Sequence, residues 1–98
     1  MTIDKKQNGS ELTLSLSGRL DTTTAPQLEE ALKESISGIK TLEFDFGALE
    51  YMSSAGLRVL LAAQKMMNKQ GKMVVKNVND VIMEVFEVTG FVDILTIE

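Results

Sequence analysis

Alternating apolar and polar residues predict a strand near the start of the chain. Leu12, Leu14 and Leu16 are separated by hydroxyl-bearing residues, which is the period of a half-buried strand. Residues 2–7 form a second, weaker strand pattern. The Asn-Gly-Ser sequence at residues 8–10 favours a tight turn between the two strands, because Asn-Gly tolerates positive φ angles. We therefore expect a two-stranded hairpin to open the fold.

Three further strands are predicted downstream of the hairpin. Residues 39–46 give the clearest pattern, because Leu42, Phe44 and Phe46 alternate with acidic residues, and a loop is expected to follow at Gly47. Two shorter apolar runs are predicted to form the remaining strands: residues 72–76 and residues 94–97.

Helical spacing of apolar residues predicts a first helix between the hairpin and the central strand. Leu28, Leu32 and Ile36 share one face of this helix. Thr24, followed three residues later by Gln27, has the form of a capping box at its start.

Two more helices are predicted after the central strand. The second begins near Ser54 and carries apolar residues over an arc wider than one stripe, so several elements should cover it. Its Met66 and Met67 fall on core-like positions, so filling gaps in the core is a better account of them than a lipid or peptide groove. A third helix is predicted from a cap at Asn79 to a stop at Gly90.

The resulting element order, β-β-α-β-α-β-α-β, predicts an α/β fold. Strand–helix–strand crossovers join parallel strands, whereas the opening hairpin is antiparallel, so the sheet should be mixed. We expect four to five strands, with the helices packed mainly on one face. The 98 residues fit one such domain, covering residues 1–98.

The composition narrows the function. A net charge of −4 leaves no basic surface for nucleic acid or for an anionic membrane. The chain has no cysteine and no histidine, which removes thiolate chemistry and the commonest general base and metal ligand. Without a phosphate-binding glycine loop or metal-spaced carboxylates, we expect no enzymatic activity, no cofactor and no metal. No apolar run approaches the ~18 residues that span a membrane, so we expect a soluble cytoplasmic protein.

Two adjacent serines mark the junction between the central strand and the second helix. Ser53 or Ser54 could be an N-cap worth ~1 kcal/mol, because the first N–H groups of a helix lack partners. The same place attracts anionic groups, so it also suits the attachment of a phosphate. Gly56 costs up to ~1 kcal/mol of helix propensity, which points to the close approach of another backbone.

A second turn is expected beside these serines. Asp21, Thr22 and Thr23 precede the first helix, just after a strand that should lie next to the central one. Loops that follow parallel strands share one edge of the sheet, so this turn should be close to Ser53 and Ser54.

Three stretches of the chain resemble the signatures of a known family: residues 18–21 (Gly-Arg-Leu-Asp), 51–57 (Tyr-Met-Ser-Ser-Ala-Gly-Leu) and 85–91 (Val-Phe-Glu-Val-Thr-Gly-Phe). Their order and spacing are similar to those of bacterial anti-sigma factor antagonists, which are single STAS domains. The resemblance implies a sheet flanked by helices, with no catalysis of its own. It also implies partner switching. The antagonist binds an anti-sigma factor that is also a serine kinase, the kinase phosphorylates it and ends the interaction, and a phosphatase restores it.

The resemblance assigns roles to individual residues. The family's phosphoacceptor matches Ser54, and Ser53, where the family often has an aspartate, is a secondary candidate. Asp21 matches an aspartate in the family's partner-binding region. Apart from the resemblance, Arg58 lies four residues after Ser54 and could reach a phosphate there. The expected partner-binding surface comprises eight residues: Asp21, Thr22, Thr23, Ser53, Ser54, Ala55, Gly56 and Arg58.

The same resemblance leaves a second function open. STAS domains also serve as scaffolds, or as accessory subunits of signalling or membrane transport complexes.

Overall fold

A four-stranded mixed sheet forms one layer of the protein, in a computed structural model that describes all 98 residues. The strands lie side by side in sequence order: β1 (Thr2–Asn8), β2 (Glu11–Leu20), β3 (Thr41–Met52) and β4 (Lys72–Lys76). β1 pairs with β2 antiparallel, and the later neighbours pair in parallel. The opening hairpin is confirmed, and Gly9 in its turn has a φ angle of +62°.

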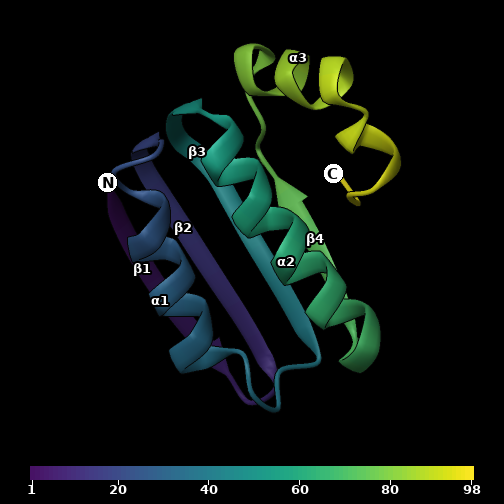
Figure 1. Cartoon of the computed structure of the whole chain (residues 1–98). Helices are drawn as coiled ribbons and strands as arrows, with labels where there is room; N and C mark the ends of the chain where they lie inside the picture. The colour runs from purple at the N-terminus through teal and green to yellow at the C-terminus, as the bar shows by residue number, and fades with distance from the viewer.

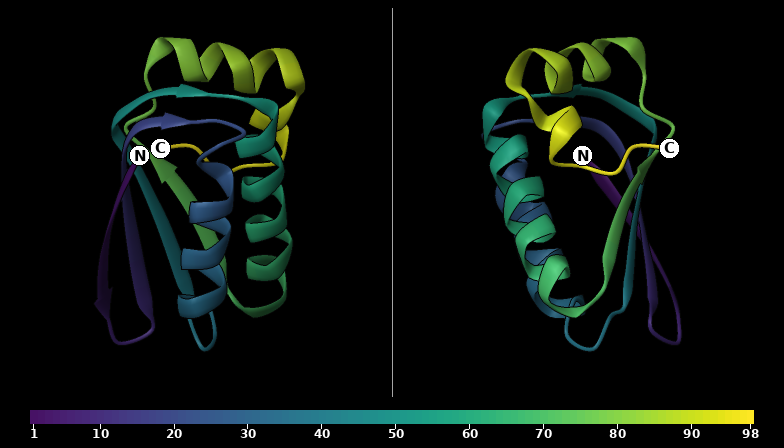
Figure 2. Two further views of the ribbon diagram at one scale, coloured as in Figure 1. Left: turned by 60° about the vertical axis from the view of Figure 1, so that its left-hand side comes forward. Right: turned by 90° about the vertical axis from the view of Figure 1, so that its right-hand side faces the viewer.

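Two helices cover one face of this sheet. α1 (Ala25–Ser35) and α2 (Ser54–Gln70) lie against the same side, while the opposite face carries no helix (Figures 1 and 2). Both helices return from the carboxyl ends of strands, so their N-termini lie at the same end of the molecule (Figure 1). α3 (Asp80–Thr89) crosses that end, near the last residues of β3 (Figure 2). The prediction of a mixed sheet with helices mainly on one face is confirmed.

The core lies between the sheet and these helices as one cluster of 24 buried residues, so the chain has a single hydrophobic core. β2 contributes Leu12, Leu14 and Leu16, as the alternating leucines predicted, and Leu20 at its end. The predicted face of α1 is buried, comprising Leu28, Leu32 and Ile36. α2 contributes a broader face, but Met66 stays 37% exposed, so the prediction that it fills the core is wrong.

β3 continues further than its sequence pattern predicts. The expected loop at Gly47 is absent, because the strand runs on to Met52. Its pairing with β2 shifts by one residue at two places, so β3 contains two bulges. Phe46, Leu49 and Met52 are therefore buried three residues apart, a spacing that does not read as a strand.

The C-terminal segment also differs from the prediction. In place of a strand over residues 94–97, a short 3-10 helix (Phe91–Asp93) precedes one parallel bridge between Val75 and Ile97. The predicted start and end of α3 are confirmed, because the Asn79 side chain accepts a hydrogen bond from Ile82 N–H and Gly90 adopts a left-handed conformation. None of the helices is long and apolar enough to cross a membrane.

Candidate functional site

Two chain segments meet where β2 and β3 end. Leu20 and Met52 are paired in the sheet register, so the residues that follow them are brought together. The N–H of Ser53 donates a 2.9 Å hydrogen bond to the carbonyl of Leu20, which joins the β2–α1 turn directly to the start of α2. The predicted proximity of the two turns is confirmed.

Asp21 organises the β2–α1 turn. Its Oδ1 accepts hydrogen bonds from the N–H of Thr23 at 3.0 Å, the hydroxyl of Thr23 at 2.7 Å and the N–H of Thr24 at 3.2 Å. These bonds, with that of the Thr23 hydroxyl the strongest, hold the pKa of the Asp21 carboxyl below its ordinary value. Asp21 is therefore a charged, well-ordered group on this surface.

The capping box predicted between Thr24 and Gln27 is wrong. The Thr24 hydroxyl instead accepts from the N–H of Asp21 at 2.8 Å and donates to the carbonyl of Arg19 at 2.8 Å. Gln27 reaches the carbonyl of Met1 at 3.2 Å. The Asp21 side chain accepts from the N–H groups of Thr23 and Thr24, which precede α1, so it stabilises the turn, and the start of α1 itself has no side-chain cap.

Neither serine at the start of α2 acts as a side-chain cap, contrary to the prediction. Ser53 occupies the N-cap position, but its hydroxyl makes no hydrogen bond and its oxygen is buried. Ser54 is the first residue of α2; it is exposed, and its hydroxyl has no hydrogen-bond partner within the chain. The more accessible of the two hydroxyls is thus that of Ser54, which is not committed to holding the helix.

Gly56 has a packing role inside the domain. A Cβ added there would lie 2.7 Å from Leu20 Cγ and 3.0 Å from Met52 Cγ, and the residue is buried. The close approach predicted for another backbone is made instead by side chains of β2 and β3. Gly56 lets the first turn of α2 sit against the ends of these strands, and in this way it positions Ser54.

Arg19 and Tyr51 belong to the same surface, although neither was among the predicted site residues. The Arg19 guanidinium lies 4.3 Å from the centre of the Tyr51 ring, and its Nε is 3.8 Å from Asp21 Oδ2. The two residues are neighbours in the sheet register, but only after the second bulge in β3. That bulge has no signal in the sequence, so the register, and with it this pair, could not be predicted.

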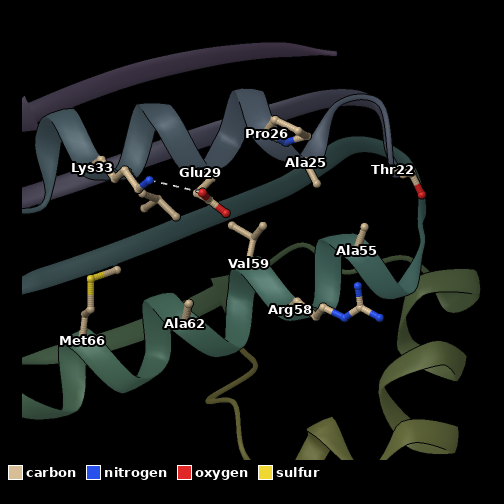
Figure 3. Close-up of a pocket in the computed structure, with 11 residues that line it drawn as sticks. Thr22, Ala25, Pro26, Glu29, Lys33, Ala55, Arg58, Val59, Ala62 and Met66 are labelled. Carbon is tan, nitrogen blue, oxygen red and sulfur yellow. Dashed lines mark ion pairs between the residues drawn. The ribbon is translucent and has the colours of Figure 1, made fainter.

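An elongated groove runs from this surface along the seam between α1 and α2 (Figure 3). Its volume is about 390 Å³, and its walls are mainly apolar. In Figure 3, Thr22, Ala55 and the Arg58 guanidinium lie at the end nearest the N-termini of the helices, and Met66 lies at the other end. Glu29 and Lys33 form a 3.3 Å ion pair on the α1 side.

The side chains at this end of the molecule are suited to contact with another protein and to modification of a serine hydroxyl. A serine nucleophile in an enzyme needs an adjacent base, and the Ser54 hydroxyl has no partner in the chain. No three of the aspartates and glutamates come together where they could hold a metal ion. What the site presents is one exposed hydroxyl, an ordered carboxylate at Asp21 and a cation at Arg58.

The chain belongs to the STAS domain family, whose model matches residues 2–98. Among its relatives is the anti-sigma-B factor antagonist of Bacillus subtilis, which is 31% identical over 98 residues covering 99% of this chain and 90% of the relative. A solved anti-sigma factor antagonist from Mycobacterium paratuberculosis superposes with a TM-score of 0.89 at 25% identity, covering 98% of this chain and 83% of that one. The phosphorylated form of the Bacillus cell fate determinant SpoIIAA has the same fold, with a TM-score of 0.78 at 18% identity, covering 99% and 91% of the two chains.

Proposed function

We propose that this protein is an anti-sigma factor antagonist that acts in the cytoplasm and is switched off by phosphorylation of Ser54. The observation that carries the proposal is the placement of Ser54. Its hydroxyl is exposed at the first position of α2 and free of hydrogen bonds, beside the ordered turn of Asp21. Membership of the STAS family and the named relatives support the same function.

The unmodified surface is well shaped for a protein partner. The Asp21 carboxylate is held by the Thr23 hydroxyl and by two backbone N–H groups, so little side-chain entropy remains to be lost when a partner binds. Ser54 is small and neutral, which allows a partner to pack closely over the start of α2. We infer that this partner is an anti-sigma factor that is also a serine kinase.

Phosphorylation would change this surface without refolding the domain. A phosphate adds about −1.5 to −2 charges near neutral pH. On Ser54 it would lie at the positive end of the α2 dipole, and Arg58 is one helical turn away. The phosphorylated domain is thus stable, whereas a partner that covers a neutral serine meets bulk and unpaired charge. A phosphatase would restore the binding form.

Mapping the phosphate by mass spectrometry tests the choice of Ser54. The protein is purified after coexpression with its anti-sigma factor kinase, beside a Ser54→Ala variant and a Ser53→Ala variant. We expect phosphate on Ser54 in the wild type and in Ser53→Ala, and none in Ser54→Ala, because the Ser53 oxygen is buried. Phosphate that persists in Ser54→Ala and disappears in Ser53→Ala would assign the acceptor to Ser53. No phosphate on either residue would favour the scaffold function.

A further inference from the structure

We propose that the groove between α1 and α2 binds a medium-chain fatty carboxylate, with the acyl chain along the apolar walls and the carboxylate on Arg58. The groove holds about 390 Å³, which is within the range of roughly 300–1,000 Å³ typical of small-molecule sites. Its polar groups are few and lie mainly at one end and along one wall (Figure 3).

The walls of the groove are suited to an unbranched chain. Ala55 and Met66 mark its two ends on α2, a span of twelve residues or about 16 Å of helix. Alanines, Val59 and Leu32 form much of its lining, so the channel is apolar and free of bulky obstruction. Met66 is 37% exposed, and a flexible thioether adapts readily to an alkyl chain.

One end of the groove is suited to an anion. Arg58 is exposed and forms no ion pair with any carboxylate of the chain. Its guanidinium extends toward the N-terminal end of α2, on the side of Thr22 (Figure 3). The starts of α1 and α2 lie at this same end, and both contribute positive potential there.

The charge of the groove is opposite in sign to that of the whole chain. Arg58, Lys33 and Glu29 are the ionised residues that line it, leaving one net positive charge, whereas the protein carries −4. Glu29 is already paired with Lys33, so Arg58 is the cation left free for a ligand. An amphipathic monoanion matches both the apolar channel and its single free cation.

Binding of this ligand would affect both anti-sigma factor binding and the phosphorylated state of Ser54. This consequence rests on the proposed function. The carboxylate on Arg58 would lie beside Ala55, within the surface proposed for the anti-sigma factor. It would also occupy the cation that a phosphate on Ser54 needs. The binding step itself requires no partner and is tested on the isolated chain, so its failure leaves the proposed function untouched.

The test is a titration of the ¹⁵N-labelled protein with sodium decanoate below its micelle concentration, followed by NMR. We expect saturable shifts confined to the residues lining the groove. Arg58→Gln should weaken binding by about fivefold, the effect of losing one partly exposed ion pair. The matched control Lys65→Gln removes an exposed cation from α2 that does not line the groove, and it should bind as the wild type does.

A second variant tests the channel. Ala62→Trp places an indole on an exposed position of the groove wall, so the fold should be retained while the channel is filled. We expect decanoate binding to be lost at an unchanged unfolding midpoint. Shifts that do not saturate, shifts centred on the exposed valines of α3, or equal affinity for wild type and Arg58→Gln would overturn the proposal. Loss of anti-sigma factor binding in Ala62→Trp, with no decanoate binding to the wild type, would assign the groove to a side chain of that partner instead.

Discussion

The position of Ser54 depends on a residue that has no side chain. Gly56 lies two residues further along α2, and the space where its Cβ would be is taken by Leu20 and Met52. The first turn of α2 can therefore lie directly on the ends of β2 and β3. At the scale of single residues, the proposed phosphoacceptor Ser54 is positioned by packing beneath it rather than by hydrogen bonds of its own hydroxyl.

Gly56→Ala should lower the free energy of unfolding by up to about 2 kcal/mol net, although alanine is the better helix former. The added methyl would lie 2.7 Å from Leu20 Cγ, so it would overpack a filled core. The destabilisation from this overpacking exceeds the gain in helix propensity, which is at most ~1 kcal/mol. The free energy of unfolding in urea measures the change.

A double-mutant cycle separates this contact from a general effect of the substitution. In a Leu20→Ala background the Cγ and Cδ atoms that the new methyl would meet are absent, so the cost of Gly56→Ala should decrease. An equal cost in both backgrounds, or stabilisation by Gly56→Ala alone, would contradict the packing role.

At the scale of elements, α3 begins with a side-chain cap, whereas α2 does not. Asn79 accepts from Ile82 N–H at 2.8 Å and donates to the carbonyl of Leu49 at 2.9 Å, so it both caps α3 and ties it to β3. α2 has no such cap, because the Ser53 hydroxyl is buried without a partner. A cap was predicted for both helices, but only that of α3 forms.

Asn79→Ala should lower the free energy of unfolding by about 1–2 kcal/mol, because it removes a cap and leaves a carbonyl of β3 without its donor. Ser53→Ala should be neutral or slightly stabilising, since it removes a buried hydroxyl that has no partner. Urea denaturation of the two variants side by side checks the contrast. A loss of 1 kcal/mol or more in Ser53→Ala would mean that its hydroxyl stabilises α2 after all.

Elements with one regular period could be predicted from the sequence. β2 and α1 follow simple alternation or helical spacing, and β4 was predicted with its observed bounds. The full length of β3 could not be predicted from the sequence, because its two bulges change the spacing of buried residues from two to three after Phe46. The last predicted strand is reduced to one bridge at Ile97, since its position depends on a tertiary contact with Val75.

The candidate site could be predicted only in part, because the bulges in β3 set some of its contacts. Topology was enough to bring Asp21 near Ser54, because loops after parallel strands share an edge. It could not show that Gly56 is buried by Leu20, or that Arg19 lies over the Tyr51 ring. These contacts depend on the register of β2 against β3, which the bulges set.

At the scale of the whole molecule, polar contacts join β3 to the chain after β4. The Asp45 carboxylate accepts from Asn77 Nδ2 at 2.9 Å and from Gly47 N–H at 2.9 Å. The Asn77 amide most of all, then the Gly47 N–H and the charge of Lys76, lowers the pKa of Asp45 below its ordinary value. The carboxylate therefore stabilises the fold in its charged form.

Acid should weaken the fold through this group. Its pKa is lower in the folded than in the unfolded chain, so its contribution is complete above the unfolded value of about 3.9 and is lost as the pH falls through the folded pKa. Asp45→Asn should lower the free energy of unfolding at about pH 7 and reduce its decrease below about pH 4. Glu30→Gln, which removes an exposed carboxylate with no ion pair, is the control. Identical pH profiles for Asp45→Asn and the wild type in urea denaturation would contradict this role.

The proposed switch belongs to the scale of the whole molecule, because it requires a partner that covers Ser54. The most direct measurement is calorimetric titration of the anti-sigma factor with the wild type, Ser54→Ala and Ser54→Asp. The wild type and Ser54→Ala should bind alike. Ser54→Asp should bind more weakly, and the loss of ~3–4 kcal/mol expected for a buried, unpaired negative charge corresponds to several hundredfold. Equal affinity for the wild type and Ser54→Asp would show that charge at Ser54 does not control binding.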